Sequence, residues 1–234
     1  MKKKIKDFLR RFPLTRKVFT RWEKQRIEDG IERDRKILHQ NGNKLIHDIQ
    51  LCIKDMNEIV FFDFGTLLGI IREGKIIGHD LDVDVGVSIR ESDTIMNTRD
   101  IFKRAGYSIF STSILDDDVI VQDTFIDSNG IHFDVSYYYI EEGKGIVYLL
   151  YRDPQKKYNA DNWDVVMASS DVVKSTILYD FYDFKVNVPE NYLDHLSNRY
   201  GENWRVPDKG YIYWKGPSTC MIEKKGKMIH YRNK

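Results

Sequence analysis

Two aspartates in an apolar segment have the type and spacing to bind one hard metal cation. Asp82 and Asp84 alternate with apolar residues over residues 81–87. In a β-strand, residues two apart lie on the same face, roughly 6.6 Å apart at about 3.3 Å per residue. We expect a strand over residues 81–89 that holds both carboxylates on one face and buries Leu81 and the valines on the other. Mg²⁺ or Mn²⁺ prefers oxygen ligands of this kind.

A glycine and a threonine upstream could bind phosphate beside these aspartates. Gly65 and Thr66 follow an apolar run and open a short helix that we expect over residues 66–72. The N-terminus of a helix presents free amide groups and the positive end of the helix dipole, and glycine lets a phosphate approach the backbone. A cation on the aspartates would hold the same phosphate group from the opposite side. Residues 61–87 therefore predict a metal-assisted phosphate site.

A third carboxylate is expected from a neighbouring strand. Asp134 is the best candidate, because it shares one face with His132 in an apolar strand over residues 131–135. Asp134 could instead be a buried strand residue that pairs with an arginine. Of the histidines, His79 and His132 are expected nearest the site, whereas the others, His195 among them, are expected at the surface or as hydrogen-bonded histidines without a role in the chemistry.

Hydrophobic periodicity along the rest of the chain predicts both helices and strands. Helical spacing continues over residues 27–57, with a break between two helices expected near Gly42. Two further helices are expected over residues 93–104 and 190–199. The expected strands cover residues 59–64, 107–113, 119–126, 131–135 and 176–188, together with a buried tyrosine-rich pair that ends at Tyr151.

The charge of the chain is unevenly distributed. The 234 residues carry a net charge of +1, but residues 1–26 hold eleven Lys and Arg against two acidic residues, so that the remaining residues carry −8. Apolar residues recur at helical spacing among these cations. The sequence therefore predicts a basic amphipathic helical arm, residues 1–36, followed by one domain, residues 37–234.

The basic arm suggests an anionic partner. Residues 1–26 could lie in the headgroup region of an anionic membrane, where each Lys or Arg contributes about 1 kcal/mol, or their apolar stripe could pack on the domain. Nucleic acid is not expected as a partner, because the rest of the chain is acidic and offers no basic stacking platform. Without a secretory apolar run after Met1, we expect a cytoplasmic protein that is peripheral at the inner face of the membrane.

The stretch around the aspartates resembles the signature of the LicD family, which includes fukutin and fukutin-related protein and belongs to the nucleotidyltransferase-fold superfamily. The family pattern of Gly-Thr-Leu-Leu-Gly, a following Arg and Asp-x-Asp-hydrophobic-Asp is present at residues 65–69, Arg72 and residues 80–84. A Val-Pro pair, a helix and Tyr-Gly over residues 188–201 resemble the closing segment of the family. Residues 78–79, Gly-His, replace the usual Pro-Trp, and the zinc-binding cysteines of some members have no counterpart.

The resemblance implies an α+β fold with a nucleotidyltransferase-like mixed β-sheet flanked by helices. It also implies a metal-dependent transfer of phosphocholine or a polyol phosphate from a CDP-linked donor to a sugar hydroxyl, with release of CMP. The acceptor would be a cell-surface glycan or its lipid-linked precursor. By position, the catalytic and metal-binding residues would be Asp82, Asp84 and Asp134. The residues near the donor phosphates would be Gly65, Thr66, Arg72 and Asp80.

Two other functions remain open at this point. A nucleotidyltransferase would use the same carboxylates but would leave a nucleoside monophosphate on the acceptor. A non-catalytic, membrane-attached protein of glycan assembly would use none of this chemistry. Identification of the small product, CMP or pyrophosphate, distinguishes the first two functions, and failure to bind any CDP-alcohol with Mg²⁺ would favour the third.

Overall fold

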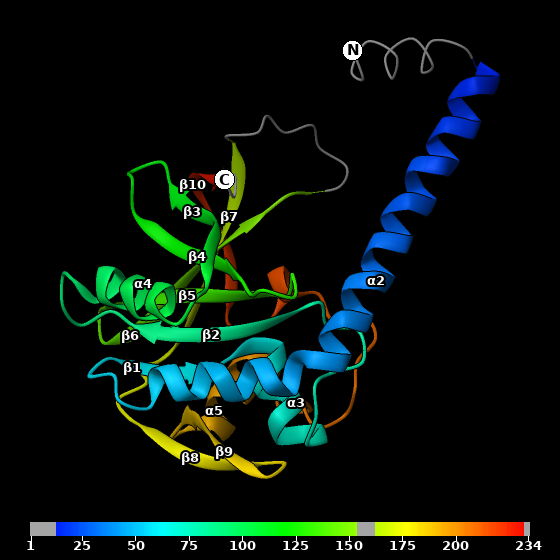
Figure 1. The fold of residues 1–234 in the computed structure, drawn as a ribbon. Coiled ribbons are helices and arrows are strands. Elements are labelled where there is room, and N and C mark those ends of the chain that lie inside the picture. The colour runs from blue at the N-terminus through cyan, green and yellow to red at the C-terminus, as the bar shows by residue number, and fades with distance from the viewer. Residues whose placement is uncertain (1–12, 154–161, 232–234) are drawn as a thin grey trace.

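The computed structural model describes residues 13–153 and 162–231 (Figure 1). Eight strands form one sheet: β1 (Ile59–Phe62), β2 (Asp82–Ser88), β3 (Ser108–Leu115), β4 (Ile120–Ile126), β5 (His132–Glu141), β6 (Lys144–Tyr151), β7 (Trp163–Asp171) and β10 (Thr219–His230). Their order is β1-β2-β5-β4-β3-β10-β7-β6, and a further pairing of β5 with β6 closes the sheet on itself. The pair β2–β5 is parallel and the other pairs are antiparallel.

Helices and one hairpin cover this sheet, which confirms the α+β class. Within the described residues the helices are α2 (Pro13–Ile53), α3 (Phe64–Glu73), α4 (Thr94–Arg104) and α5 (Tyr192–Tyr200), with a short 3-10 helix η1 (Tyr213–Lys215). A separate hairpin consists of β8 (Thr176–Phe181) and β9 (Phe184–Pro189). The helices predicted over residues 66–72, 93–104 and 190–199 are confirmed to within two residues at each end, which is the usual uncertainty of helix boundaries.

The strand that carries the paired aspartates alternates as predicted, with one exception. Val83, Val85 and Val87 are fully buried, and Asp82 and Asp84 lie on the other face of β2. Leu81 was expected on the buried face, but 37% of its surface is exposed. The reason is that β2 begins one residue later, so that Leu81 still belongs to the preceding loop.

Helix α2 is continuous through Gly42, so the predicted break between two helices is wrong. Figure 1 shows instead that the axis of α2 changes direction part of the way along its length. Gly42 has a different reason to be a glycine: a Cβ atom there would lie 2.4 Å from the Cδ1 atom of Ile76, in the loop that leads from α3 to β2. A larger residue at this position would push the end of the Ile76 side chain aside, so close packing of this loop on α2 favours glycine.

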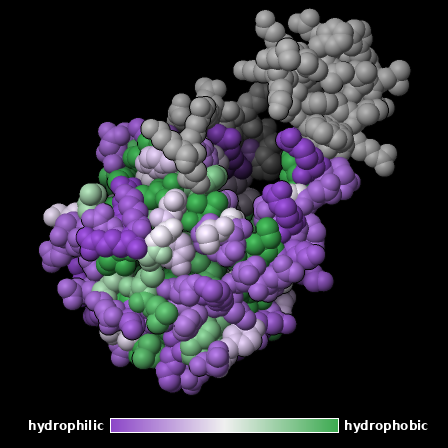
Figure 2. All heavy atoms as spheres, viewed as in Figure 1, coloured by the Kyte–Doolittle hydropathy of each residue, from purple (hydrophilic) through white to green (hydrophobic). Residues whose placement is uncertain are grey.

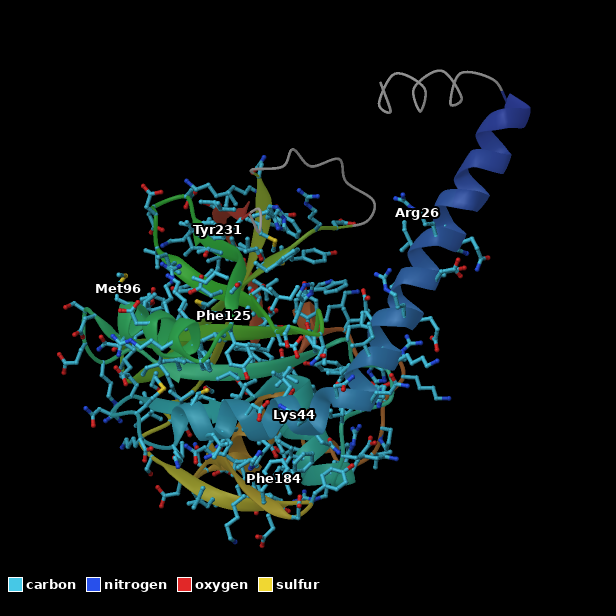
Figure 3. All side chains as sticks on the ribbon, viewed as in Figure 1. Arg26, Lys44, Met96, Phe125, Phe184 and Tyr231 are labelled. Atoms are coloured by element: carbon cyan, nitrogen blue, oxygen red, sulfur yellow. The ribbon has the colours of Figure 1, made fainter. Side chains whose placement is uncertain are left out.

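The two parts of α2 differ in burial. Residues 24–36 are mostly exposed, and Arg26 lies on this projecting part in Figure 3. From Leu38 onward α2 turns apolar side chains into the main core and packs on β2 and β9. The predicted membrane contact falls on residues 1–26, and the side chains up to residue 23 lie outside the described part of the chain, so this contact stays a prediction. No helix among the described residues is both long and apolar enough to cross a membrane.

Strands β7 and β10 are absent from the sequence prediction, which assigned no strand to these residues. β10 pairs with both β3 and β7, so the sheet cannot close without it. Its lysine-rich sequence has low intrinsic strand propensity, and pairing with two neighbours decides its conformation instead. The predicted buried pair that ends at Tyr151 is also corrected, since β6 pairs with β5 only at its first residues and with β7 along its whole length.

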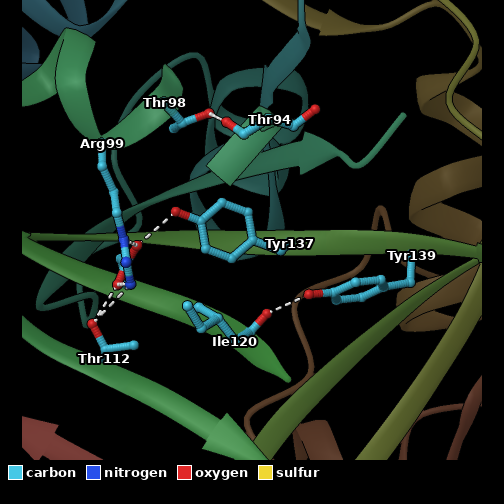
Figure 4. Close-up of polar contacts among 8 residues, drawn as sticks. Thr94, Thr98, Arg99, Thr112, Ile120, Tyr137 and Tyr139 are labelled. Atoms are coloured by element: carbon cyan, nitrogen blue, oxygen red, sulfur yellow. Dashed lines mark hydrogen bonds and ion pairs between the residues drawn. The ribbon is translucent and has the colours of Figure 1, made fainter. Parts of the chain in front are cut away.

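A buried ion pair joins α4 to the sheet (Figure 4). Arg99 donates from Nε and Nη2 to the two carboxylate oxygens of Asp123, at 2.7 and 2.8 Å. Thr112 and Tyr137 donate their hydroxyl groups to the same carboxylate, at 2.5 and 2.6 Å. Asp123 is fully buried, and every partner lies on a different element, so this carboxylate fastens α4, β3 and β5 to β4.

The face of the molecule shown in Figure 2 is mostly hydrophilic, with small apolar patches between the charged side chains. Beneath it, the main core joins apolar residues of α2, α3 and α4 to those of β2, β4 and β5. Phe125, labelled in Figure 3, stacks on Phe133 with 5.1 Å between the ring centroids. These rings lie on the core face of β4 and β5, opposite the face that carries the predicted catalytic carboxylates.

Candidate active site

The parallel pairing of β2 with β5 brings the three predicted carboxylates together. Asp84 is directly opposite Asp134, and Asp82 is directly opposite His132. Because residues two apart share a face, all four side chains lie on the same face of two adjacent strands. The predicted association of Asp134 with the Asp82–Asp84 pair therefore follows from the strand register.

Asp134 has polar neighbours on its other side. Gln122 of β4 donates from Nε2 to Oδ2 of Asp134 at 2.6 Å, and Thr124 is opposite Asp134 in the β4–β5 ladder and hydrogen-bonds to it. The alternative that Asp134 pairs with an arginine is not supported, because its hydrogen-bond partners among the described residues are Gln122 and Thr124. These neutral partners leave the negative charge of the carboxylate uncompensated.

Burial and mutual repulsion raise the pKa values of the clustered carboxylates. Burial raises the pKa of Asp134 to about 7, and the charge of Asp82 adds to the effect. The pKa of Asp84 is raised well above its usual range, first by burial and then by Asp82, Asp134, Asp80 and Asp63. Burial and the charges of Asp82 and Glu73 raise the pKa of Asp80 to about 7. A group of acids that resists ionisation in this way attracts a cation.

Gly65 and Thr66 lie beside the carboxylates and make different contacts. The hydroxyl oxygen of Thr66 accepts a hydrogen bond from the backbone amide of Asp84 at 2.8 Å, which ties the start of α3 to β2. A Cβ atom at Gly65 would lie 3.0 Å from an oxygen of Asp80, so glycine here leaves room for that carboxylate. The side chain of Thr66 is buried, whereas Gly65 lines the neighbouring pocket.

A pocket of about 1090 Å³ opens along one face of α3 and reaches the carboxylate group at Asp80, whereas Asp82, Asp84 and Asp134 do not line it. Its lining includes Gly65, Arg72, Asp80, Tyr200, Trp204 and Tyr211. Three of these residues carry a buried side-chain atom without a hydrogen-bond partner: Arg72 at Nε, Asp80 at Oδ2 and Trp204 at Nε1. A buried polar atom without a partner is costly, so these atoms indicate a place where a bound molecule contributes hydrogen bonds.

Arg72 and the two histidines take distinct places around the site. Arg72 donates from Nη1 to the carbonyl oxygen of Trp204 at 3.3 Å, which joins α3 to the segment after α5. His79 lines the pocket with 83% of its side chain exposed. His132 is half-buried and stacks on Phe110, with 4.5 Å between the ring centroids. His132 is thus beside Asp82, on the side away from the pocket.

A buried network under the site was missed in the sequence. Asp63, the residue before α3, contacts Nε2 of His195 at 2.8 Å and accepts a hydrogen bond from Tyr138. Arg199 donates to the same tyrosine hydroxyl at 2.6 Å. Burial alone would raise the pKa of Asp63, but His195 and Arg199 outweigh it and lower the pKa to about 2.

His195 was predicted to have no role in the chemistry, yet it is buried and reaches the start of α3. The sequence holds one signal that could have found it. His195 and Arg199 are four residues apart, so they lie on one face of α5, and both are polar residues on the face that packs into the protein. Their partners, Asp63 and Tyr138, could not be read from the sequence.

The carboxylates of the site offer the kind of ligand atoms that a hard divalent cation prefers. Asp82, Asp84 and Asp134 offer carboxylate oxygens, which Mg²⁺ and Mn²⁺ prefer. The unpartnered Oδ2 of Asp80 adds an uncompensated oxygen beside them. As the side chains are placed in residues 13–153 and 162–231, no three His, Cys, Asp or Glu side chains are grouped closely enough to hold one ion. The predicted metal set therefore stays a prediction.

The raised pKa of Asp134 has a consequence for stability. At pH values between the usual pKa of an aspartate and about 7, the folded state binds more protons than the unfolded state. The stability that the protonated Asp134 contributes is therefore complete below about pH 4 and is lost as the pH rises through 7. In metal-free buffer at pH 8, we expect Asp134→Asn to unfold at a higher denaturant concentration than the wild type. The gain should be on the order of a few kcal/mol, since one unit of pKa shift corresponds to about 1.4 kcal/mol.

The measurement is urea unfolding of both proteins at pH 4 and pH 8 with a chelator present. Asp118→Asn is the matched control, because this aspartate is exposed and pairs with Lys227 far from the site. The control should show no such gain at pH 8. A gain for Asp134→Asn that is equal at both pH values would contradict the argument.

Comparisons with known proteins show the family of this chain. The family described as LicD/FKTN/FKRP, nucleotidyltransferase domain, matches residues 57–207, which include all the predicted site residues. The ribitol-5-phosphate transferase FKTN of Mus musculus is 23% identical over 220 residues, which cover 90% of this chain and 44% of that protein. The Homo sapiens protein of the same name is 25% identical over 72% of this chain and 35% of its own length.

The chain thus spans less than half the length of these relatives. The family match, in contrast, covers more than half of the chain and contains β2, β5, α3 and α5, the elements that build the site. The resemblance seen in the motifs is confirmed: this protein belongs to the LicD family.

Proposed function

We propose that this protein transfers a phosphorylated alcohol from a CDP-linked donor to a hydroxyl group of a glycan or of its lipid-linked precursor, with release of CMP. Because the relatives are named ribitol-5-phosphate transferases, ribitol 5-phosphate is the first alcohol to test, followed by glycerol phosphate and phosphocholine. One observation carries the proposal: the register of β2 and β5 gathers Asp82, Asp84 and Asp134 on one face. The neighbouring carboxylate, Asp80, lines a pocket large enough for a nucleotide-linked donor.

The donor is proposed to lie along α3. Its diphosphate would be placed near Gly65, at the N-terminus of α3, where free amide groups and the helix dipole favour negative charge. The nucleoside would extend into the pocket beside Trp204 and Tyr211, with Arg72 as a hydrogen-bond donor. The unpartnered atoms of Arg72 and Trp204 support this placement, since both are donors and cytosine and ribose carry several acceptors.

The acceptor hydroxyl is proposed to approach from the opposite side, over β5. In phosphoryl transfer the attacking and leaving oxygens are roughly in line, so the acceptor cannot share the pocket with the leaving CMP. Asp134 would orient this hydroxyl and accept its proton. Gln122 keeps the carboxylate of Asp134 in place.

Asp82, Asp84 and Asp134 would hold the divalent cation, Mg²⁺ or Mn²⁺. Such a cation, when bound, neutralises the charge that develops on the phosphates as the bond to CMP breaks. The carboxylates themselves would gain from the cation, because it relieves the repulsion that raises their pKa values.

The test is an assay of the purified protein with CDP-ribitol, CDP-glycerol and CDP-choline, each with Mg²⁺ and with a ribitol-phosphate or sugar acceptor. We expect CMP from one donor, together with an acceptor whose mass has increased by the phosphorylated alcohol. Pyrophosphate from CTP, with a nucleoside monophosphate left on the acceptor, would show a nucleotidyltransferase instead. If no CDP-alcohol raises the melting temperature with Mg²⁺ present, the non-catalytic function is favoured.

A further inference from the structure

The residue at the start of α3 has an unusual backbone conformation. Phe64 has φ of +43°, in the left-handed region that residues other than glycine rarely adopt. Three other such residues are found among the described ones, Asp118, Glu142 and Tyr182, and each lies in a turn between neighbouring strands. Phe64 instead joins β1 to α3, directly before Gly65. Such a conformation costs on the order of 1–3 kcal/mol and persists where the surrounding structure holds it.

Helix α5 contacts two adjacent residues of this turn, Asp63 and Phe64. The guanidinium of Arg199 lies over the ring of Phe64, 4.2 Å from its centroid. The preceding residue, Asp63, is bound by His195 and by Tyr138, and Tyr138 in turn accepts a hydrogen bond from Arg199. Arg199 and His195 are almost fully buried, at 5% and 1% exposure. The first two residues of the strained turn are thus fastened to α5, and the contact between His195 and Asp63 joins residues 132 positions apart in the chain.

The same connection fixes a predicted catalytic carboxylate. The backbone amide of Asp63 donates to the carbonyl oxygen of Asp84 at 3.1 Å, and the backbone amide of Asp84 donates to Thr66 at 2.8 Å. Residues 63–66 therefore hold both backbone hydrogen-bonding groups of Asp84. A shift of this turn would move Asp84 and the amide groups near Gly65 together.

We propose that Arg199 and His195 are positioning residues, which hold the strained turn of residues 63–66 so that Asp84 and the N-terminus of α3 meet the donor phosphates in one geometry. The inference rests on the proposed function for its effect on the donor, but the held turn can be observed without it. The two residues touch no part of the reacting groups and act through Asp63 and Phe64.

Arg199→Lys tests the contact with Phe64. Lysine keeps the positive charge near Asp63 but lacks the flat guanidinium that covers the ring. We expect kcat/KM for the donor to fall about 10- to 100-fold, as is typical when a residue that orients a ligand is changed, with KM for the acceptor unchanged. His195→Gln should be milder than His195→Leu, because glutamine can still donate a hydrogen bond to Asp63.

Amide hydrogen exchange tests the turn itself. In Arg199→Lys, exchange over residues 63–67 and at the amide of Asp84 should be at least tenfold faster than in the wild type, with α4 unchanged. The matched control is Arg99→Lys, which alters the other buried arginine that joins a helix to the sheet. This control should lower stability and speed exchange in α4, with no change in the donor KM.

A double-mutant cycle tests whether Arg199 acts through Phe64. Phe64→Gly removes both the ring and the strain, so Arg199→Lys should cost less in this background than in the wild type. Tyr182→Gly, which relieves the same backbone conformation in the β8–β9 turn, should leave the cost of Arg199→Lys unchanged.

Two results would overturn the inference. One is wild-type exchange over residues 63–67 in Arg199→Lys, and the other is a loss of donor kcat/KM that Arg99→Lys shows equally. If the wild-type protein turns over no CDP-alcohol, the proposed function fails, and the exchange measurement still decides whether α5 holds the turn.

Discussion

Asp84→Asn is expected to lower kcat/KM for transfer by about 10²- to 10³-fold, which is the usual cost of removing one electrostatic contact to the transition state. Asp84 lies between Asp82 on its own strand and Asp134 on β5, so it is the centre of the carboxylate group. Asparagine keeps the size of the side chain, and the contacts of Asp84 with Thr66 and Asp63 use backbone atoms, so the local structure should remain.

The same substitution should leave the metal-free protein at least as stable as the wild type. Burial and four neighbouring carboxylates raise the pKa of Asp84, so a neutral side chain relieves repulsion at pH 7 and above. Added Mg²⁺ should raise the melting temperature of the wild type and have a smaller effect on Asp84→Asn. The two measurements are CMP release from the donor and thermal unfolding with and without Mg²⁺.

Asp118→Asn serves as the control for charge removal, because its exposed ion pair with Lys227 is remote from the site and surface pairs contribute little. It should retain wild-type turnover and the wild-type response to Mg²⁺. Near wild-type turnover of Asp84→Asn with Mg²⁺ would rule out the proposed role of this carboxylate.

Asp123→Ala is expected to lower the free energy of unfolding by about 3–5 kcal/mol, since it leaves the charge of a buried arginine uncompensated. Asp123 accepts four hydrogen bonds, two from Arg99 and one each from Thr112 and Tyr137. All of these donors would lose their acceptor. The loss is about the size of the total stability margin of many domains, so the variant should be partly unfolded at 37 °C.

Chemical unfolding of purified protein at 15 °C measures this loss, and the double substitution Arg99→Met with Asp123→Ala separates its causes. Removal of both charges should be less costly than removal of Asp123 alone, because no unpaired charge is left behind. The cycle also needs the single substitution Arg99→Met. If the double variant loses as much free energy of unfolding as the two single variants together, the ion pair between Arg99 and Asp123 does not cause the loss. Activity per folded molecule should not change, because Asp123 lies on the face of β4 opposite Gln122 and the site.

The carboxylate site could be predicted from local pattern and the known motif. The alternation of apolar and acidic residues around Asp82 and Asp84 can be recognised without knowledge of the partner strands. A period of two in a buried strand places both acids on one face. The helix that starts near Gly65 follows from its apolar stripe in the same way. Asp134 was predicted as the third acid because its own strand shows the same alternation, and the β2–β5 register places it there.

The boundaries of the sheet could not be predicted from such patterns. β10 carries three lysines between residues 224 and 227, and its conformation depends on pairing with β3 and β7, which are far away in the sequence. Gly42 suggested a helix break, but its conformation is helical and the reason for the glycine is Ile76, 34 residues later. In each case a contact between distant segments outweighs the local propensity.

The sequence by itself determined which residues can do the chemistry: Asp82, Asp84 and Asp134 for a cation, and Gly65 with Thr66 at the start of a helix. It did so because strand and helix periods are local properties of the chain. Only the tertiary structure decided how these residues are held in place. The strained Phe64, the buried Asp63 and the α5 residues His195 and Arg199 form one connected group because the fold packs α5 against β7 and β9. No local pattern encodes a contact between residues 132 positions apart.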